Sequence, residues 1–508
     1  MKDNQWITIL HYNDVYDIEK SVRFIPLYQK ENSEDTLRIF SGDFLNPSMM
    51  STEMKGLQFE KIFDKLRPHY TMIGNHELDF GEEYFCKVAS KFNTKWVASN
   101  LRRKSDGEIF CNAKPYYIHD VNGVKIGVIG LLDTYFIEAS ILNMDHYDYE
   151  DYMTVGRELS KMLKGMGCQL VIAVTHMKTL SDELLMNDEN DIDVILGGHD
   201  HIYIVMHNRR KLLIKSGDNF NSFSRIDICI GSPEEALMYM NELPVEDQKT
   251  ALARFRNKDT NLHDFILDGG QHSLFCKVQR VLTPSDGEED IEIKNYYERT
   301  WRDFEQRNNY PALFMTSELQ LEDRVIRCGP SKFIDNLALV INQYVPTDIV
   351  LLHAGHIRIN QNFESKTTLR GIDLHRLLPF YDYFLSFRAM GSTILQILEH
   401  SVRLLPSSTG TLFSTSGIAF EVDVNQKPMN RIDPLKVTVL GKPFDLEKEY
   451  SFSVLSFIGM GNDGVTMIKD CEKLKFEKEM YLLDKLKEFV ILPNDSRVRQ
   501  QFEYYKTH

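Results

Sequence analysis

Two stretches of this chain decide its fold: Met72-Ile73-Gly74-Asn75-His76-Glu77 and Leu196-Gly197-Gly198-His199-Asp200-His201. Each follows a short apolar run and places metal-binding side chains directly after glycine. Glycine lets the backbone turn tightly and approach another group closely. Polar residues that follow buried strands collect at one edge of a sheet, where open α/β sheets bind ligands. The pattern predicts an α/β protein with a metal site, although a helix cap and a surface turn are the structural alternatives.

Asp14, Asp43 and His176 each follow an apolar run typical of a buried strand. Taken singly, such an aspartate usually caps a turn or a helix, and such a histidine is usually structural. Taken with the two stretches above, they supply the parts of a two-metal phosphoesterase centre. His76 would lie near the substrate, and Asp79 could hold its ring by accepting the second N–H.

The bulk properties limit the possible functions. The chain has 508 residues, 43% hydrophobic and 26% charged, which is typical of a soluble globular protein with two or three domains. Its net charge of -15 argues against nucleic-acid binding. We find no secretory signal and no apolar run of about 18 residues, so no membrane partner is expected. Seven scattered cysteines without a C-x-x-C pair argue against a disulfide framework and favour a cytoplasmic protein.

Strand-like and helical patterns alternate through the first half, which predicts a sheet covered by helices. An acidic turn at 284–290 suggests a boundary, and a charged helix follows it. We therefore predict a first domain at 1–290, a connecting helix or hinge at 291–308 and a second α/β domain at 309–508. Residues 233–268 are polar and receive no assignment. The expected strands of the first domain are 7–10, 37–40, 70–73, 96–98, 125–131, 170–174 and 194–196, and its expected helices are 58–66, 83–92 and 155–166.

The order of these motifs, Asp, Gly-Asp, Gly-Asn-His-Glu, His and Gly-His-x-His, resembles the calcineurin-like metallophosphoesterase superfamily. The resemblance implies a four-layer sandwich in which two mixed sheets are covered by helices. It also implies two divalent ions about 3.5 Å apart, bridged by Asp43. Zinc, manganese and iron all suit histidine, aspartate and asparagine ligands. The remaining ligands by resemblance are Asp14 and His201 for the first ion, and Asn75, His176 and His199 for the second.

Tyr16 departs from this pattern, because the superfamily usually has histidine two residues after the first aspartate. A neutral phenol, with a pKa near 10, is a poor ligand. The first ion could therefore bind more weakly, use an extra water or have Tyr16 only as a neighbour of its ligands. A nucleotide-binding pseudoenzyme is the non-enzymatic alternative.

The second half carries its own pattern in Ala354-Gly355-His356-Ile357-Arg358, Phe380, Phe457 and Gly461-Asn462-Asp463-Gly464. Read alone, the phenylalanines are core aromatics and the last stretch is a turn. Together and in this order they resemble the C-terminal domain of the 5′-nucleotidase family. That resemblance implies that Phe380 and Phe457 sandwich a base, which suits stacking that tolerates different bases.

By the same resemblance, Asp463 binds the ribose hydroxyls, while Arg358 and, on a weaker match, Arg324 bind the phosphate region. His353-Ala354-Gly355 replaces the family's Asn-Gly-Gly, and Gly461-Asn462 replaces its paired glycines, so the base preference is open. The resemblance predicts an enzyme that releases phosphate from nucleoside 5′-monophosphates, with a small-molecule nucleotide as its partner. A nucleoside-diphosphate sugar, a 2′,3′-cyclic nucleotide or a sugar phosphate is the alternative substrate on the same centre.

Overall fold

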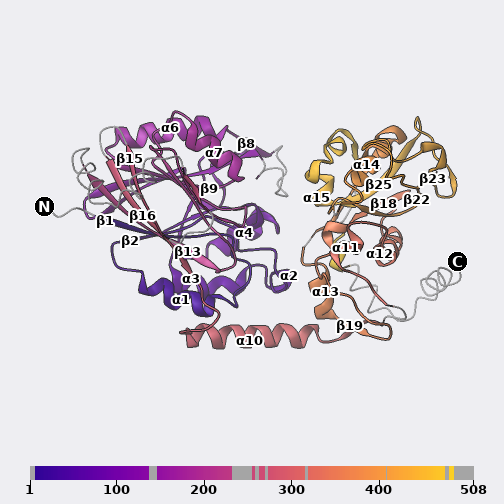
Figure 1. The fold of residues 1–508 in the computed structure, drawn as a ribbon, viewed down its shortest axis with the longest axis horizontal. Helices are drawn as coiled ribbons and strands as arrows, with labels where there is room; N and C mark the ends of the chain where they lie inside the picture. The colour runs from indigo at the N-terminus through magenta and orange to yellow at the C-terminus, as the bar shows by residue number, and fades with distance from the viewer. Residues whose placement is uncertain are drawn as a thin grey trace. The chain divides into compact units, whose positions relative to one another are not determined.

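The computed structural model describes residues 6–134, 136, 146–231, 255–257, 262–268, 273–314, 318–380, 382–407, 409–474 and 480–484. The chain divides into two compact units, Met1–Arg302 and Asp303–His508. Figure 1 shows the elements of each unit and labels many of them.

The first unit contains a sheet in the order β15-β16-β13-β1-β2-β3-β4. Strands β1 to β4 pair in parallel, whereas β13, β16 and β15 pair in antiparallel fashion. Parallel strands with helical crossovers bring their carboxyl ends to one edge of a sheet. The strands are β1 (Trp6–Tyr12), β2 (Thr36–Phe40), β3 (Tyr70–Met72), β4 (Lys95–Val97), β13 (Ser222–Gly231), β15 (Leu262–Asp268) and β16 (Ser273–Leu282).

A second sheet of this unit runs in the order β14-β11-β12-β10-β9-β7-β6. Its central strands β7, β9, β10 and β12 are parallel, and its outer pairs are antiparallel. Both sheets are therefore mixed. The strands are β6 (Tyr116–Val121), β7 (Val124–Leu132), β9 (Leu170–His176), β10 (Val194–Gly197), β11 (Tyr203–His207), β12 (Leu212–Ser216) and β14 (Phe255–Asn257).

Helices cover the outer faces of the two sheets (Figure 1). On the first sheet, Phe24 and Tyr28 of α1 (Ser21–Lys30) meet the ring of Tyr12 with centroid distances of 5.8 and 5.6 Å. On the second sheet, α6 (Tyr152–Gly165) buries its apolar side in the same core as β7 and β9. α3 (Glu60–Leu66) and α7 (Thr179–Asn187) complete the two outer layers. The predicted four-layer α/β architecture is confirmed.

The second unit is built on a five-stranded sheet in the order β21-β18-β25-β20-β26. Apolar residues of its strands and helices form one continuous core. The strands are β18 (Ile349–His353), β20 (Phe384–Met390), β21 (Phe413–Ser416), β25 (Glu449–Leu455) and β26 (Glu472–Leu474), and the helices include α12 (Lys332–Asn342), α13 (Gly371–Leu377) and α14 (Gly391–Val402).

Helix α10 (Ile291–Asn308) spans the segment predicted as the connection, and the division between the units falls within it, between Arg302 and Asp303. Its first turn belongs with the first unit. Lys65 Nζ lies 2.7 Å from Glu292 Oε2, and Arg23 Nη2 lies 2.6 Å from Glu289 Oε1 in the acidic turn. These ion pairs fasten the turn to α1 and α3.

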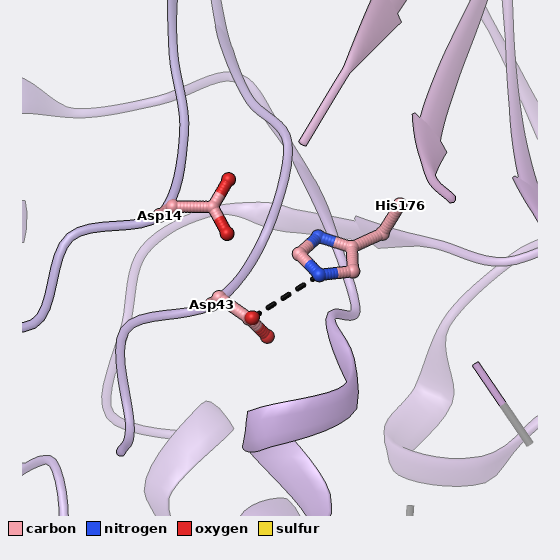
Figure 2. A group of neighbouring side chains, drawn as sticks. All are labelled: Asp14, Asp43 and His176. Carbon is pink, nitrogen blue, oxygen red and sulfur yellow. Dashed lines mark ion pairs between the residues drawn. The ribbon is translucent and has the colours of Figure 1, made fainter. Parts of the chain in front are cut away.

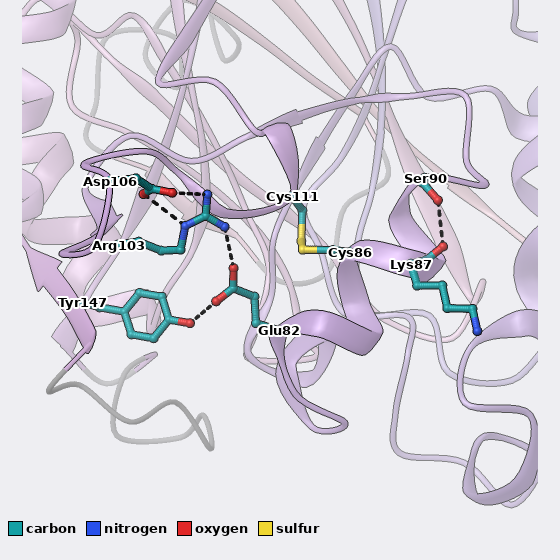
Figure 3. The surroundings of a disulfide bond; sticks show 8 residues. All are labelled: Glu82, Cys86, Lys87, Ser90, Arg103, Asp106, Cys111 and Tyr147. Carbon is teal, nitrogen blue, oxygen red and sulfur yellow. Dashed lines mark hydrogen bonds and ion pairs between the residues drawn. A yellow bond between two sulfur atoms is a disulfide. The ribbon is translucent and has the colours of Figure 1, made fainter.

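Cys86 and Cys111 form a disulfide bond, although the scattered cysteines argued against a disulfide framework (Figure 3). The bond joins α4 (Glu82–Ala89) to the short η3 turn (Phe110–Asn112). The two cysteines are 25 residues apart in the sequence. Close to it, Glu82 pairs with Arg103 at 2.9 Å and accepts a hydrogen bond from the Tyr147 hydroxyl. Sequence spacing carries no signal for this pair, because only the fold brings the two cysteines together. The cysteines therefore no longer favour a reducing compartment.

Most of the unassigned segment 233–268 lies outside the described residues, and its described parts form β14 and β15. Within the described ranges, no helix has the length and apolar character needed to cross a bilayer.

Candidate functional site

The predicted metal ligands lie at the carboxyl ends of strands from both sheets of the first unit. Asp14, Asp43 and Asn75 follow β1, β2 and β3, and Asn75 begins the η2 turn (Asn75–Leu78). His176 ends β9, and His199 follows β10. The parallel order of these strands therefore gathers residues that are far apart in sequence.

The loops that carry these residues pack too closely for larger side chains. A Cβ on Gly74 would lie 2.0 Å from Asp43 Oδ1, and one on Gly198 would lie 2.6 Å from the Ser41 carbonyl oxygen. Asp43 and His199 have left-handed φ angles of 65° and 84°. Such conformations are costly for residues other than glycine and often occur at functional sites. The paired-glycine pattern in the sequence reflects this crowding.

Asp14, Asp43 and His176 form the centre of the site (Figure 2). Their ligand atoms all lie within 4.8 Å of one another, and all three residues are buried. His176 Nε2 lies 3.1 Å from Asp43 Oδ2, while His176 Nδ1 donates to the Ser41 carbonyl at 2.7 Å. That bond fixes the orientation of the ring, so Nε2 faces the Asp43 carboxylate. Burial opposes protonation, but Asp43 outweighs it and raises the pKa of His176 to about 10. The site therefore attracts positive charge.

Asn75 and His199 extend this centre. Asn75 Oδ1 lies 3.2 Å from His176 Nε2 and 3.1 Å from His199 Nδ1. Together with Asp43 and His176, these two residues supply two oxygens and two ring nitrogens, a donor set that suits a divalent transition-metal ion. The four residues predicted for the second ion therefore fit it.

The residues predicted for the first ion differ, because the Tyr16 hydroxyl lies among them. It is 3.1 Å from Asp14 Oδ1, 3.0 Å from Asp43 Oδ2 and 2.8 Å from His201 Nε2. Burial and the two carboxylates raise the pKa of Tyr16 well above its ordinary value, so the phenol is neutral.

His76 and Asp79 lie beside this centre. His76 Nδ1 donates to Asp79 Oδ2 at 2.7 Å, and the His76 backbone N–H donates to Asp43 Oδ1 at 2.9 Å. Asn46 Nδ2 also donates to Asp79 at 2.7 Å, which fixes the carboxylate. Burial lowers the pKa of His76, but Asp79 and Asp43 outweigh it and raise the value to about 9. The imidazole is therefore protonated at neutral pH. Because Asp79 bonds to Nδ1, it does not occupy Nε2.

Glu77 has a structural role that the sequence reasoning did not assign. Its carboxylate is fully buried and accepts the backbone N–H groups of Asp43, Phe44 and Gly74 at 2.9, 2.7 and 2.5 Å. It therefore ties the loop after β2 to the loop after β3. The Gly-Asn-His-Glu motif contained this signal, since a glutamate after a buried strand needs partners.

Lys215, at the end of β12, was also missed. Its ammonium group is fully buried and pairs with Asp182 Oδ2 at 3.0 Å and Asp200 Oδ2 at 2.6 Å. It also donates to the carbonyl oxygens of Met177 and Gly198 at 2.7 and 2.8 Å. Lys215 thus fastens both histidine-bearing loops of the second sheet. A lysine that ends the apolar run Leu212-Leu213-Ile214 was the available signal.

In the second unit, Phe380 and Phe457 are both half-buried and flank a pair of buried histidines. The His356 and Phe380 ring centroids are 5.4 Å apart, and those of His353 and Phe457 are 6.0 Å apart. His353 Nε2 and His356 Nδ1 lie 3.1 Å from each other. The Arg358 guanidinium lies 5.1 Å from the Phe380 ring centroid. The structure thus brings Arg358 and both phenylalanines to one cluster.

The other predicted substrate residues are placed differently. Arg324 is 82% exposed and pairs with Glu322. Arg327 instead lies near enough to Arg358 and Asp463 to influence the pKa of each. Asp463 is exposed, with a left-handed φ of 52°, and its carbonyl oxygen lies 3.0 Å from His400 Nε2. Arg327 was not singled out, because the run Arg324-Val325-Ile326-Arg327 offers two arginines and no feature to choose between them.

Comparison with known families matches a different family model to each unit. Residues 7–203 match the calcineurin-like phosphoesterase family, and residues 314–470 match the 5′-nucleotidase C-terminal domain. The chain belongs to the 5′-nucleotidase family. It is therefore a metallophosphoesterase of that family, a class of hydrolases.

The similarity to known proteins covers most of the chain. The rat (Rattus norvegicus) 5′-nucleotidase is 23% identical over 514 residues, covering 93% of this chain and 85% of its own. The structure of the 5′-nucleotidase precursor from Thermus thermophilus shares the fold with a TM-score of 0.66 and 19% identity, over 96% of this chain and 97% of that one. The NAD nucleotidase of Haemophilus influenzae shares it with a TM-score of 0.56 and 16% identity, over 96% of each chain.

Proposed function

We propose that this protein hydrolyses nucleoside 5′-monophosphates to nucleosides and phosphate in a metal-dependent reaction. The observation that carries the proposal is the convergence of Asp43, Asn75, His176 and His199 next to the His76–Asp79 pair. A divalent ion bound there would polarise the phosphoryl group and activate water for in-line attack. The same ligands suit zinc, manganese and iron, so they do not determine which of these ions binds.

His76 would act on the leaving group. Asp79 holds Nδ1, so Nε2 is the ring atom available to the substrate. A protonated imidazole with a pKa of about 9 can stabilise charge on a phosphoryl oxygen or donate a proton to the departing 5′ alkoxide. Asp79 supports the charged form and fixes the ring, which makes His76 the catalytic residue and Asp79 its positioning residue.

The second unit would recognise the nucleoside. Phe380 and Phe457 offer ring faces for a base, since stacking on aromatic rings is worth about 1–3 kcal/mol per base. Arg358, beside Phe380, offers a guanidinium that suits phosphate oxygens. Asp463 offers a carboxylate for ribose hydroxyls. His353 stands where the family resemblance implies the asparagine of Asn-Gly-Gly, and its ring contacts that of Phe457, so we expect the base edge to meet an imidazole rather than an amide.

A substrate panel tests the proposal. The full chain with added Mn²⁺ or Zn²⁺ is assayed for phosphate and nucleoside release from AMP, a nucleoside-diphosphate sugar, a 2′,3′-cyclic nucleotide and ribose 5-phosphate. We expect kcat/KM for AMP to exceed that for ribose 5-phosphate at least tenfold, because the latter has no base to stack. His76→Ala should lower kcat for AMP by about 100-fold or more.

The other outcomes separate the alternatives. Equal rates for AMP and ribose 5-phosphate would contradict recognition of the nucleoside but would still support a phosphoesterase activity. A preference for the sugar nucleotide or the cyclic nucleotide would keep the centre and change the substrate. Nucleotide binding without turnover of any compound in the panel would support a pseudoenzyme.

A further inference from the structure

Tyr16 is held firmly at the position where the resemblance to the superfamily motif implies a metal-binding histidine. Its side chain is buried, and its backbone N–H donates to Asn219 Oδ1 at 3.1 Å. Its ring meets that of His76 edge-on at 5.9 Å and that of His201 at 5.2 Å between centroids. These contacts hold the phenol from two sides and keep its hydroxyl aimed at Asp14 and Asp43.

The hydroxyl contacts the very atoms that a first ion would need. Asp14 Oδ1, Asp43 Oδ2 and His201 Nε2 all lie within 3.1 Å of it. A phenol extends further from the backbone than an imidazole by about the length of one metal–ligand bond, roughly 2 Å. A tyrosine in place of histidine therefore carries its oxygen towards the ion's own position rather than to the edge of its coordination shell.

Hydrogen bonding separates this group of atoms from the neighbouring one. The Tyr16 hydroxyl can donate its proton to one carboxylate and accept from His201, so the first group is satisfied without an ion. At the second group, Asn75 Oδ1 lies 3.2 Å from His176 Nε2 and 3.1 Å from His199 Nδ1, and His176 Nε2 lies 3.1 Å from Asp43 Oδ2. Two ring nitrogens and two oxygens are a donor set that suits a transition-metal ion once the rings are deprotonated. The Tyr16 hydroxyl lies where an ion would have to lie among the first set, whereas the second set can hold one.

We propose that the Tyr16 hydroxyl takes the place of the first metal ion, so that the protein has a one-ion centre held by Asp43, Asn75, His176 and His199. This inference rests on the proposed function only for the ion that remains. Tyr16 is then a positioning residue that keeps Asp14 and His201 together and leaves Asp43 to serve one ion.

Metal stoichiometry tests the inference without reference to turnover. The full chain is stripped with a chelator, titrated with Mn²⁺ by calorimetry, and analysed for bound metal after dialysis and by electron paramagnetic resonance. We expect one equivalent in the wild type, with the hyperfine pattern of an isolated ion. Tyr16→His should bind two equivalents and give the signal of a coupled pair. Tyr16→Phe, which removes the hydroxyl without supplying a ligand, should retain at least one.

Each other result decides against the inference. Two equivalents in the wild type that fall to one in Tyr16→Phe would make Tyr16 a ligand. Two equivalents in both proteins would make the phenol irrelevant to metal number, and one equivalent in a folded Tyr16→His would show that Tyr16 does not exclude the ion. These results would leave the proposed function intact, whereas no bound metal in any variant would remove both. If Tyr16→His does not fold, the wild type and Tyr16→Phe still decide the question.

Discussion

Replacing Lys215 by methionine should destabilise the first unit strongly, because it leaves buried carboxylates without their cation. Asp182 and Lys215 are both fully buried, and the lysine has two carboxylate and two carbonyl partners. Removing one partner of a buried ion pair typically costs about 3–5 kcal/mol. Burial raises the pKa of Asp182 to about 6 against the opposing effect of Lys215, so the stranded carboxyl could partly escape this cost by taking up a proton.

Lys211 supplies a matched control just before the same strand. It is also buried, but its partners are neutral, the Asp188 carbonyl at 2.6 Å and Asn190 Oδ1 at 2.7 Å. Losing two such hydrogen bonds should cost about 1–3 kcal/mol. With a urea slope of about 2.5 kcal/mol/M, Lys215→Met should lower the unfolding midpoint by roughly 1.6 M and Lys211→Met by roughly 0.8 M.

The assay is urea unfolding of the full chain at pH 7.5, followed by tyrosine and tryptophan fluorescence and by circular dichroism. Adding Asp182→Asn to Lys215→Met should recover part of the loss, since it removes one stranded charge. The reasoning would be refuted if Lys215→Met lowered the midpoint no more than Lys211→Met, or if the double variant were less stable than Lys215→Met.

Three further predictions concern the centre and the second unit. Glu77→Gln keeps the shape of the side chain but leaves only one of its two acceptor oxygens for the backbone N–H groups of the loops. The metal affinity measured by calorimetry should therefore fall about 10–100-fold. An unchanged affinity would show that Glu77 does not position the metal-binding loops. Phe457→Ala should raise KM for AMP about tenfold while leaving KM for ribose 5-phosphate unchanged, and parallel changes would exclude base stacking. Burial lowers the pKa of His353 to about 4. As the pH falls below about 6.5, this histidine therefore takes up a proton in the unfolded chain but not in the folded one. The free energy of unfolding of the second unit should fall by up to roughly 3 kcal/mol by pH 4. His353→Asn should flatten this slope in urea midpoints measured at pH 7 and pH 4.5, and an unchanged slope would assign the acid sensitivity elsewhere.

The sequence predicted the fold well where patterns are local. The strands that lead to Asp14, Asp43 and His176 are short apolar runs, and the loops after them carry recognisable motifs. Parallel strand order then places their ends together, so the grouping of these three residues could be anticipated from the sequence.

Local sequence patterns could not predict contacts between segments that are distant in the chain. Lys215 acts through Asp182 and Asp200, which share no sequence pattern with it. Cys86 and Cys111 meet only because α4 and η3 pack together. The position of Tyr16 was recognised as a departure, but the convergence of its hydroxyl on three partners depends on side-chain reach, which a motif does not record.

The number of reactive thiols in a sample of this protein shows whether the Cys86–Cys111 bond has formed, and so whether the protein was made under oxidising conditions. Of the cysteines outside the bond, Cys168, Cys229 and Cys276 are buried, and Cys328 and Cys471 are half-buried. A maleimide added to the native protein should therefore label chiefly the half-buried pair, and two further sites should react after gentle reduction. The ratio of these mass additions gives the oxidised fraction directly. Protein recovered from its natural source would thereby report whether that compartment oxidises thiols.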